Sequence, residues 1–185
     1  MLLWYDFMDK EINMQYGLTT SVKDKLKLAT LPAGTEENPM FCWEVNLKKV
    51  YNRNVLMIVH ADTRYCLVFV GMTTGTWKNL QTFIDDAIFR AFIDNGFTEQ
   101  DACRYFRMTS PPVFTKTHGK AAIGGMNHIA SYLPWIITGW DSELYQRNLS
   151  KNINGELCHI AAHPEEDYCI PCELFVREMR KLLSE

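Results

Sequence analysis

The chain has 185 residues, of which 47% are hydrophobic and 12% aromatic, enough to form one well-buried core. We therefore expect a single domain over residues 1–185, with residues 1–12 as an N-terminal extension. The formal charge of −3 and the isoelectric point near 6.0 argue against a protein that binds nucleic acid through a basic excess. No apolar run reaches the roughly 18 to 20 residues of a membrane span, and scattered cysteines are typical of a reducing compartment. We expect a cytoplasmic protein without a membrane partner.

The first half of the chain predicts a meander of antiparallel strands. Within residues 41–48 the hydrophobic period is two, so that Trp43 and Val45 share one face while Glu44 and Asn46 share the other. The two strands that follow are continuously apolar, which indicates that both of their faces are covered. In chain order the predicted elements are a strand over 14–18, a brief helix over 19–28, a loop over 31–39, and strands over 41–48, 55–59 and 65–70.

Helices dominate the second half. Apolar residues recur at helical spacing from Trp77 until Asn95-Gly96, and Thr98 caps the next helix. We therefore expect an α+β fold, in which a mainly antiparallel sheet of about four to six strands, with a β-meander near residues 41–70, packs against several helices. The remaining predicted elements are a strand over 113–117, helices over 120–133 and 141–152, a weak strand over 157–162 and a terminal helix over 173–183.

A series of short patterns resembles a known family. The family is uncharacterised, mostly bacterial and of similar chain length, and is described only as a domain of unknown function. The resemblance covers roughly residue 14 to the C-terminus and implies no activity, cofactor or catalytic residue. The patterns are Trp43-x-x-Asn46-Leu47, Asn52-Arg53, His60-Ala61-Asp62-Thr63-Arg64-Tyr65, Thr115-Lys116-Thr117 and Gly125-Met126-Asn127.

This chain departs from the family at one turn. Relatives usually carry Asn-Arg-Ser just before the apolar helix, where this chain has Gly119-Lys120-Ala121. Lysine keeps the positive charge but lacks the planar fork with which arginine grips a carboxylate or phosphate. Any anion-gripping role that the resemblance implies is therefore weaker here.

The segment from Val113 to His128 contains the first candidate site. An apolar strand leads into a basic turn, and the turn opens onto a helix whose first amides point outward, an arrangement that favours an anion. The alternative is a purely structural turn in which Thr117 caps the helix and the lysines are solvated. The candidate ligand-binding residues are Lys116, Thr117, His118, Lys120 and Asn127.

Two classes of function remain open for this segment. The first is a non-enzymatic binding or regulatory module for a small anionic ligand or a protein partner, with a homodimer as one expected assembly. The second is an enzyme that acts on a phosphate-bearing or nucleotide substrate, with His118 or His128 as acid or base and Lys116 and Lys120 stabilising charge. The enzyme requires His118, Lys116 and Asn127 to converge in one cleft.

Near the C-terminus, thiol and imidazole groups gather within a short stretch. Cys158, His163, Cys169 and Cys172 offer the sulfur-rich ligand set that structural zinc prefers. The alternative is a strand end with free thiols. A zinc-stabilised structural protein is the third functional hypothesis, and no other cofactor is predicted.

The polar face of the strand over 41–48 is the last candidate. Glu44, Asn46 and Lys48 share this face, and Arg53, His60, Asp62 and Arg64 occupy nearby turns. These residues either line a small cleft or form the solvated side of an edge strand and its hairpins. The edge strand is the favoured interpretation.

Overall fold

The fold was analysed in a computed structural model, which describes residues 12–184. Residues 1–11 of the predicted N-terminal extension lie outside this range. The described elements are β1 (Asn13–Leu18), α1 (Thr20–Lys25), the short 3-10 helix η1 (Pro39–Phe41), β2 (Cys42–Val50), β3 (Arg53–His60), β4 (Cys66–Val70), α2 (Thr74–Lys78), α3 (Leu80–Asp94), α4 (Glu99–Arg107), β5 (Ser110–Lys116), α5 (Gly119–Ile136), α6 (Arg147–Gly155) and α7 (Pro171–Ser184).

The strands form one mixed sheet in the order β4-β3-β2-β1-β5. β2, β3 and β4 are the predicted meander and pair in antiparallel fashion. β1 pairs in parallel with both β2 and β5, so the N-terminal strand lies inside the sheet. The α+β class, the number of strands and the meander are confirmed.

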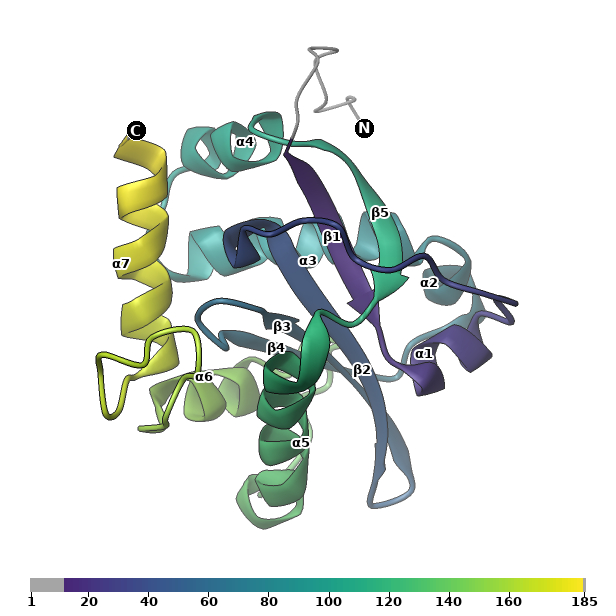
Figure 1. The fold of residues 1–185 in the computed structure, drawn as a ribbon. Helices are drawn as coiled ribbons and strands as arrows, with labels where there is room; N and C mark the ends of the chain where they lie inside the picture. The colour runs from purple at the N-terminus through teal and green to yellow at the C-terminus, as the bar shows by residue number, and fades with distance from the viewer. Residues whose placement is uncertain (1–11, 185) are drawn as a thin grey trace.

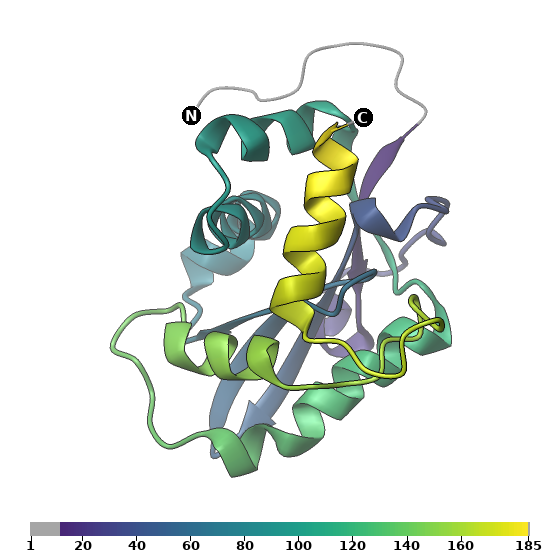
Figure 2. The same ribbon diagram turned by 90° about the vertical axis from the view of Figure 1, so that its left-hand side faces the viewer.

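Helices cover both faces of the sheet. On one face α3, α4 and α7 pack over an aromatic core that includes Trp43, Phe92 and Phe175. On the other face α5 and α6 supply Met126 and Ile153 to a second apolar cluster against β3 and β4. Figure 2 shows the sheet between α3 and α4 on one side and α5 on the other. The apolar strands β3 and β4 are therefore covered on both faces, as their lack of alternation predicted.

The two edges of the sheet are protected differently. At β4, the side chain of Asn154 on α6 accepts from the N–H of Cys66 at 2.7 Å and donates to its carbonyl at 2.8 Å. At the other edge, β5 begins with Ser110 and includes two prolines, which an edge strand tolerates because its outer N–H groups need no partner in the sheet. The sequence prediction had started this strand later, at residue 113.

Some predicted elements were wrong in extent or type. The helical run predicted from Trp77 is two helices, since α2 begins earlier, at Thr74, and Asn79 separates it from α3. The helix expected from Asp141 begins at Arg147. The weak strand over 157–162 does not form, since only Cys158 makes a bridge there, to Cys169. Its apolar residue Ile160 packs in a small separate cluster instead of extending the sheet.

Candidate functional site

A row of polar residues crosses the α5 face of the sheet. Thr115, Gly17 and Glu44 are register partners on β5, β1 and β2. Glu44 is fully buried, and Asn46, two residues further along β2 on the same face, is 3% exposed. The expected edge strand was therefore wrong: β2 is the central strand, and α5 packs over the polar face that was predicted to be solvated (Figure 1).

His118, at the start of α5, closes over Glu44. Its backbone N–H donates to Glu44 Oε1 at 2.9 Å, and its Nδ1 lies 2.6 Å from the same oxygen. Its Nε2 lies 2.9 Å from Gln15 Oε1 on β1. These contacts fix the turn between β5 and α5 onto strands β1 and β2.

The hydrogen-bond partners of His118 engage both of its ring nitrogens. The N–H of Thr35 donates to Gln15 Oε1 at 3.1 Å, and Gln15 Nε2 is 2.9 Å from Thr35 Oγ1, so the orientation of the amide is fixed. His118 Nε2 must then donate to that oxygen. Nδ1 shares a proton with Glu44, whichever of the two atoms holds it. Neither ring nitrogen keeps a free lone pair.

Two glycines make room for this arrangement. A Cβ at Gly17 would lie 2.3 Å from Glu44 Oε2, and a Cβ at Gly34 would lie 2.6 Å from His118 Cδ2. Both distances are far below van der Waals contact, so the carboxylate and the imidazole occupy space that only glycine leaves. Glu44 Oε2 is buried and has no hydrogen-bond partner among the described residues.

Beside this pair lies a cavity of about 720 Å³, which we call the lysine cavity. Among the described residues, its charged lining residues are Lys23, Lys48 and Lys116, and no carboxylate lines it. Lys48 and Lys116 form no ion pair with any residue that the structure describes, whereas Lys23 lies 3.7 Å from Asp24. The other lining residues are Leu18, Thr19, Thr20, Ser21, Ala29, Thr30, Leu31, Asn46, Thr117, Ile123, Met126 and Asn127.

Polar groups on the wall of the lysine cavity are available to a ligand. Asn46 Oδ1 accepts from Thr19 Oγ1 at 3.1 Å, while its Nδ2 has no hydrogen bond to a described residue. Asn127, on α5, is exposed and also lacks such a bond. The cavity therefore offers amide donors together with ammonium groups, a combination that suits an anion.

The predicted binding residues divide between two cavities. Lys116, Thr117 and Asn127 line the lysine cavity. His118 lines an adjoining cavity of about 300 Å³, which we call the histidine cavity and which also contacts Glu44, His60 and Arg64. The enzyme hypothesis requires His118, Lys116 and Asn127 to share one cleft, and His118 lies in the other cavity.

Two other predicted residues lie outside the lysine cavity. Lys120 is exposed and does not line it. His128 is exposed on α5, where its Nδ1 is 3.4 Å from Arg64 Nη2. Sequence reasoning missed Lys23 as a binding residue and assigned Lys48 to a different candidate site. The available signal for Lys48 was its spacing of two residues from Asn46, which places both side chains on one face of the strand.

Burial sets the chemistry of the histidine cavity. Burial, and then the nearby charge of Glu44, raises the pKa of the Cys42 thiol to about 12, so this thiol is protonated at neutral pH and a poor nucleophile. Burial lowers the pKa of His60 to about 4. His60 Nε2 donates to the carbonyl of Met40 at 3.1 Å, and the neutral ring is held by Thr63.

The structure does not gather the four predicted zinc ligands. Cys158 and Cys169 face each other across a backbone bridge, and Cys172 packs against the main core. His163 Nε2 is 2.9 Å from Asp62 Oδ2. The zinc site stays a prediction that these positions do not favour.

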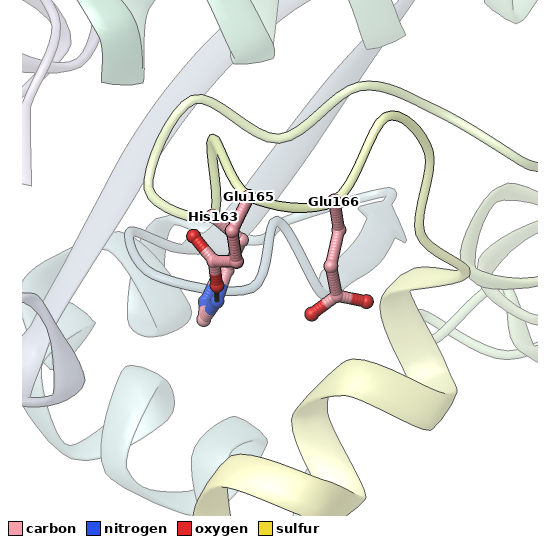
Figure 3. Close-up of side chains that lie close together, drawn as sticks. All are labelled: His163, Glu165 and Glu166. Atoms are coloured by element: carbon pink, nitrogen blue, oxygen red, sulfur yellow. Dashed lines mark ion pairs between the residues drawn. The ribbon is translucent and has the colours of Figure 1, made fainter.

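A different group of possible ligands lies in the same loop. Among the described residues, His163, Glu165 and Glu166 place ligand atoms within 4.8 Å of one another. Figure 3 shows Glu165 over the His163 ring and Glu166 further along the loop. His163 is already held by Asp62, and Glu166 pairs with Arg177, so the donor atoms have protein partners.

Comparison with known proteins identifies the family. A family model described as a domain of unknown function, DUF6933, matches residues 15–174. The chain belongs to the DUF6933 family. Comparison with curated proteins and with solved structures gave no match. In the part of the chain that the structure describes, no helix has the length and hydrophobicity of a membrane span.

Proposed function

We propose that this DUF6933 protein is a binding module for a small anionic ligand, bearing phosphate or carboxylate groups, and that the ligand occupies the lysine cavity. One observation carries the proposal: among the described residues, every charged residue that lines this cavity is a lysine, and Lys48 and Lys116 have no ion-pair partner. Like charges without partners in one concave site raise the local potential and attract an anion. A second cavity, lined by Lys25, Lys27 and Lys78, also has lysine as its only charged lining residue among those described, but Lys25 there lies over the Trp77 ring.

The walls of the cavity support a ligand that is partly apolar. Leu18, Ile123 and Met126 line it together with the two asparagines Asn46 and Asn127. Amide groups both donate and accept hydrogen bonds, so they orient a ligand that carries polar groups besides its anionic end. Small-molecule sites commonly combine such apolar walls with a few polar groups.

The hydrogen bonding of His118 favours binding over catalysis. A general base needs a free lone pair within reach of the proton that it removes. Both nitrogens of His118 are engaged, by Glu44 and by Gln15. In this proposal His118 is a positioning residue that holds the turn between Lys116 and α5, the helix that carries Asn127, against the sheet.

The test is calorimetric titration at low ionic strength, with inorganic phosphate, pyrophosphate and citrate as probes. We expect at least one probe to bind saturably, and Lys48→Gln and Lys116→Gln each to weaken its binding by about tenfold, the loss of one charge-assisted contact. Raising the salt concentration should weaken binding further.

Lys49→Gln is the matched control. Lys49 is exposed, adjoins Lys48 on β2 and does not line the cavity. This variant should bind as the wild type does. An equal loss of binding in Lys49→Gln and Lys48→Gln, or no saturable binding of any probe, would refute the proposal. Lys120→Gln tests the remaining lysine of the sequence prediction and should have little effect.

A further inference from the structure

Cys158 and Cys169 lie directly opposite each other in the segment that precedes α7. The N–H of each donates to the carbonyl of the other, both at 2.9 Å, in an isolated antiparallel bridge. Residues that exchange both hydrogen bonds in this way have Cα atoms about 5.5 Å apart. This separation lies within the range of about 4.4 to 6.8 Å that a disulfide spans.

The two side chains share one environment. Opposed residues in an antiparallel pair project to the same side of the bridge. Accordingly, Cys169 belongs to the small apolar cluster with Ile160 and Leu174, and Cys158 packs against that cluster. Both cysteines are free thiols in this structure.

We propose that Cys158 and Cys169 form a reversible intramolecular disulfide. The Cβ atoms of a hydrogen-bonded pair must approach by about 1 Å to be bridged. The bridge is isolated and lies outside the five-stranded sheet, so this movement disturbs no neighbouring strand. The hydrogen bond from Cys169 Sγ to Glu166 Oε2, which is 3.5 Å long, is lost.

The oxidant is a low-molecular-weight disulfide such as oxidised glutathione. Cys158 is the accessible thiol, because it is half-buried and lines an open cavity beside Arg64. Its thiolate attacks one sulfur of the oxidant, which forms a mixed disulfide and releases one thiol. The Cys169 thiolate then displaces the second thiol, so two protein thiols are oxidised and one disulfide is reduced to two thiols.

The pKa values of these thiols set the conditions for the reaction. Burial raises the pKa of both, and the charge of Arg64 partly offsets this effect at Cys158. The thiolate fraction therefore grows with pH, and we expect faster closure at pH 8.5 than at pH 7.

Formation of the disulfide would restrict the movement of a loop that lines the histidine cavity. Residues 159–168 become a covalently closed loop, and within it Ile160, Ala161 and Ala162 line that cavity. The carbonyl of His159 accepts from Arg64 Nη1 at 2.7 Å. Oxidation thus restricts the loop that holds Arg64 beside α5.

The experiment equilibrates the full-length protein, pretreated with a chelator, with glutathione at graded ratios of oxidised to reduced form. Trapping of free thiols and peptide mapping by mass spectrometry then locate the disulfide. We expect one intramolecular bond between Cys158 and Cys169, lost in Cys158→Ser and Cys169→Ser and kept in Cys103→Ser and Cys172→Ser. The oxidised wild type should melt about 5 °C higher than the reduced form.

Mapping of the wild type does not depend on whether any variant folds. A bond that joins a different pair of cysteines would overturn the proposal. So would six free thiols, or only mixed disulfides with glutathione, at the most oxidising ratio.

Discussion

The histidine cavity and the lysine cavity lie side by side under α5, but they differ in whether their charged side chains have partners in the protein. At the first, Glu44 is fully buried and His118 pairs with its Oε1. At the second, Lys48 and Lys116 line a cavity and have no ion-pair partner among the described residues. Paired, buried charges fix a structure, whereas unpaired charges that share a cavity are kept at some cost to stability and are available to a ligand. Changes at the two places should therefore have different consequences.

The largest effect is expected from Glu44→Ala. This change leaves the His118 imidazole without its partner inside the protein, and we expect the free energy of unfolding to fall by about 3 kcal/mol. Urea denaturation measures this loss of stability. Glu37→Ala is the control, because Glu37 is exposed on the wall of the same histidine cavity and should change the stability little. Similar losses in the two variants would mean that the pair does not fix the turn.

The pH dependence of stability tests the buried histidine of this cavity, His60. Burial lowers the pKa of His60 to about 4 from an ordinary value of 6.5, so the folded state prefers the neutral ring. The stabilisation is present above pH 6.5 and is lost as the pH falls toward 4, by about 3 kcal/mol in total. Denaturation of wild type and His60→Gln between pH 7.5 and 4 should show the difference between them shrinking by this amount. A constant difference would contradict it.

Gly34→Ala should have an intermediate effect. The new methyl group would press on the His118 ring, at 2.6 Å from Cδ2, and we expect a loss of about 2 kcal/mol from overpacking. Gly124→Ala on α5 is the control, because its Cβ would meet nothing within 4 Å and alanine favours a helix. The control should be neutral or stabilising in thermal denaturation. Equal effects would show that the His118 ring can move aside.

The smallest effect on stability is expected in the lysine cavity. Lys48→Gln removes one of three like charges and no ion pair with a described residue, so we expect the free energy of unfolding to stay the same or rise by about 0.5 kcal/mol. Anion binding should weaken in the same variant. A clear loss of stability, measured beside Lys49→Gln as a control, would indicate that Lys48 has a structural role.

The elements that sequence reasoning predicted well are local ones. The meander of β2, β3 and β4 is encoded by alternation and by turns between neighbours. The parallel pairing of β1 with β5 joins residues about a hundred positions apart, and no local pattern reports it. The pairing of β1 with both β2 and β5 places β2 inside the sheet, and α5 covers its polar face. This is why the polar face was mistaken for the solvated side of an edge strand.

Only the part of the candidate site that is local in sequence was predicted. Lys116, Thr117 and Asn127 belong to one segment, and the basic turn of that segment identified it as a candidate. Lys23 joins them only through the fold, since α1 follows β1 at the same end of the sheet. His118 turns away to Glu44 because Gly17, on the strand between them, leaves room for the carboxylate. A sequence pattern does not show which side chain fills the space beside a glycine on a neighbouring strand.

The most direct test of a binding site in the lysine cavity is an NMR titration of the isotopically labelled protein with pyrophosphate. Amide shifts report which part of the backbone senses the anion. We predict that the shifts concentrate at residues that line the lysine cavity, namely 19–21, 23, 46, 48, 116–117 and 127. Shifts concentrated at residues 36–37 and 160–162, which line the histidine cavity, or no saturable shifts at all, would contradict the account.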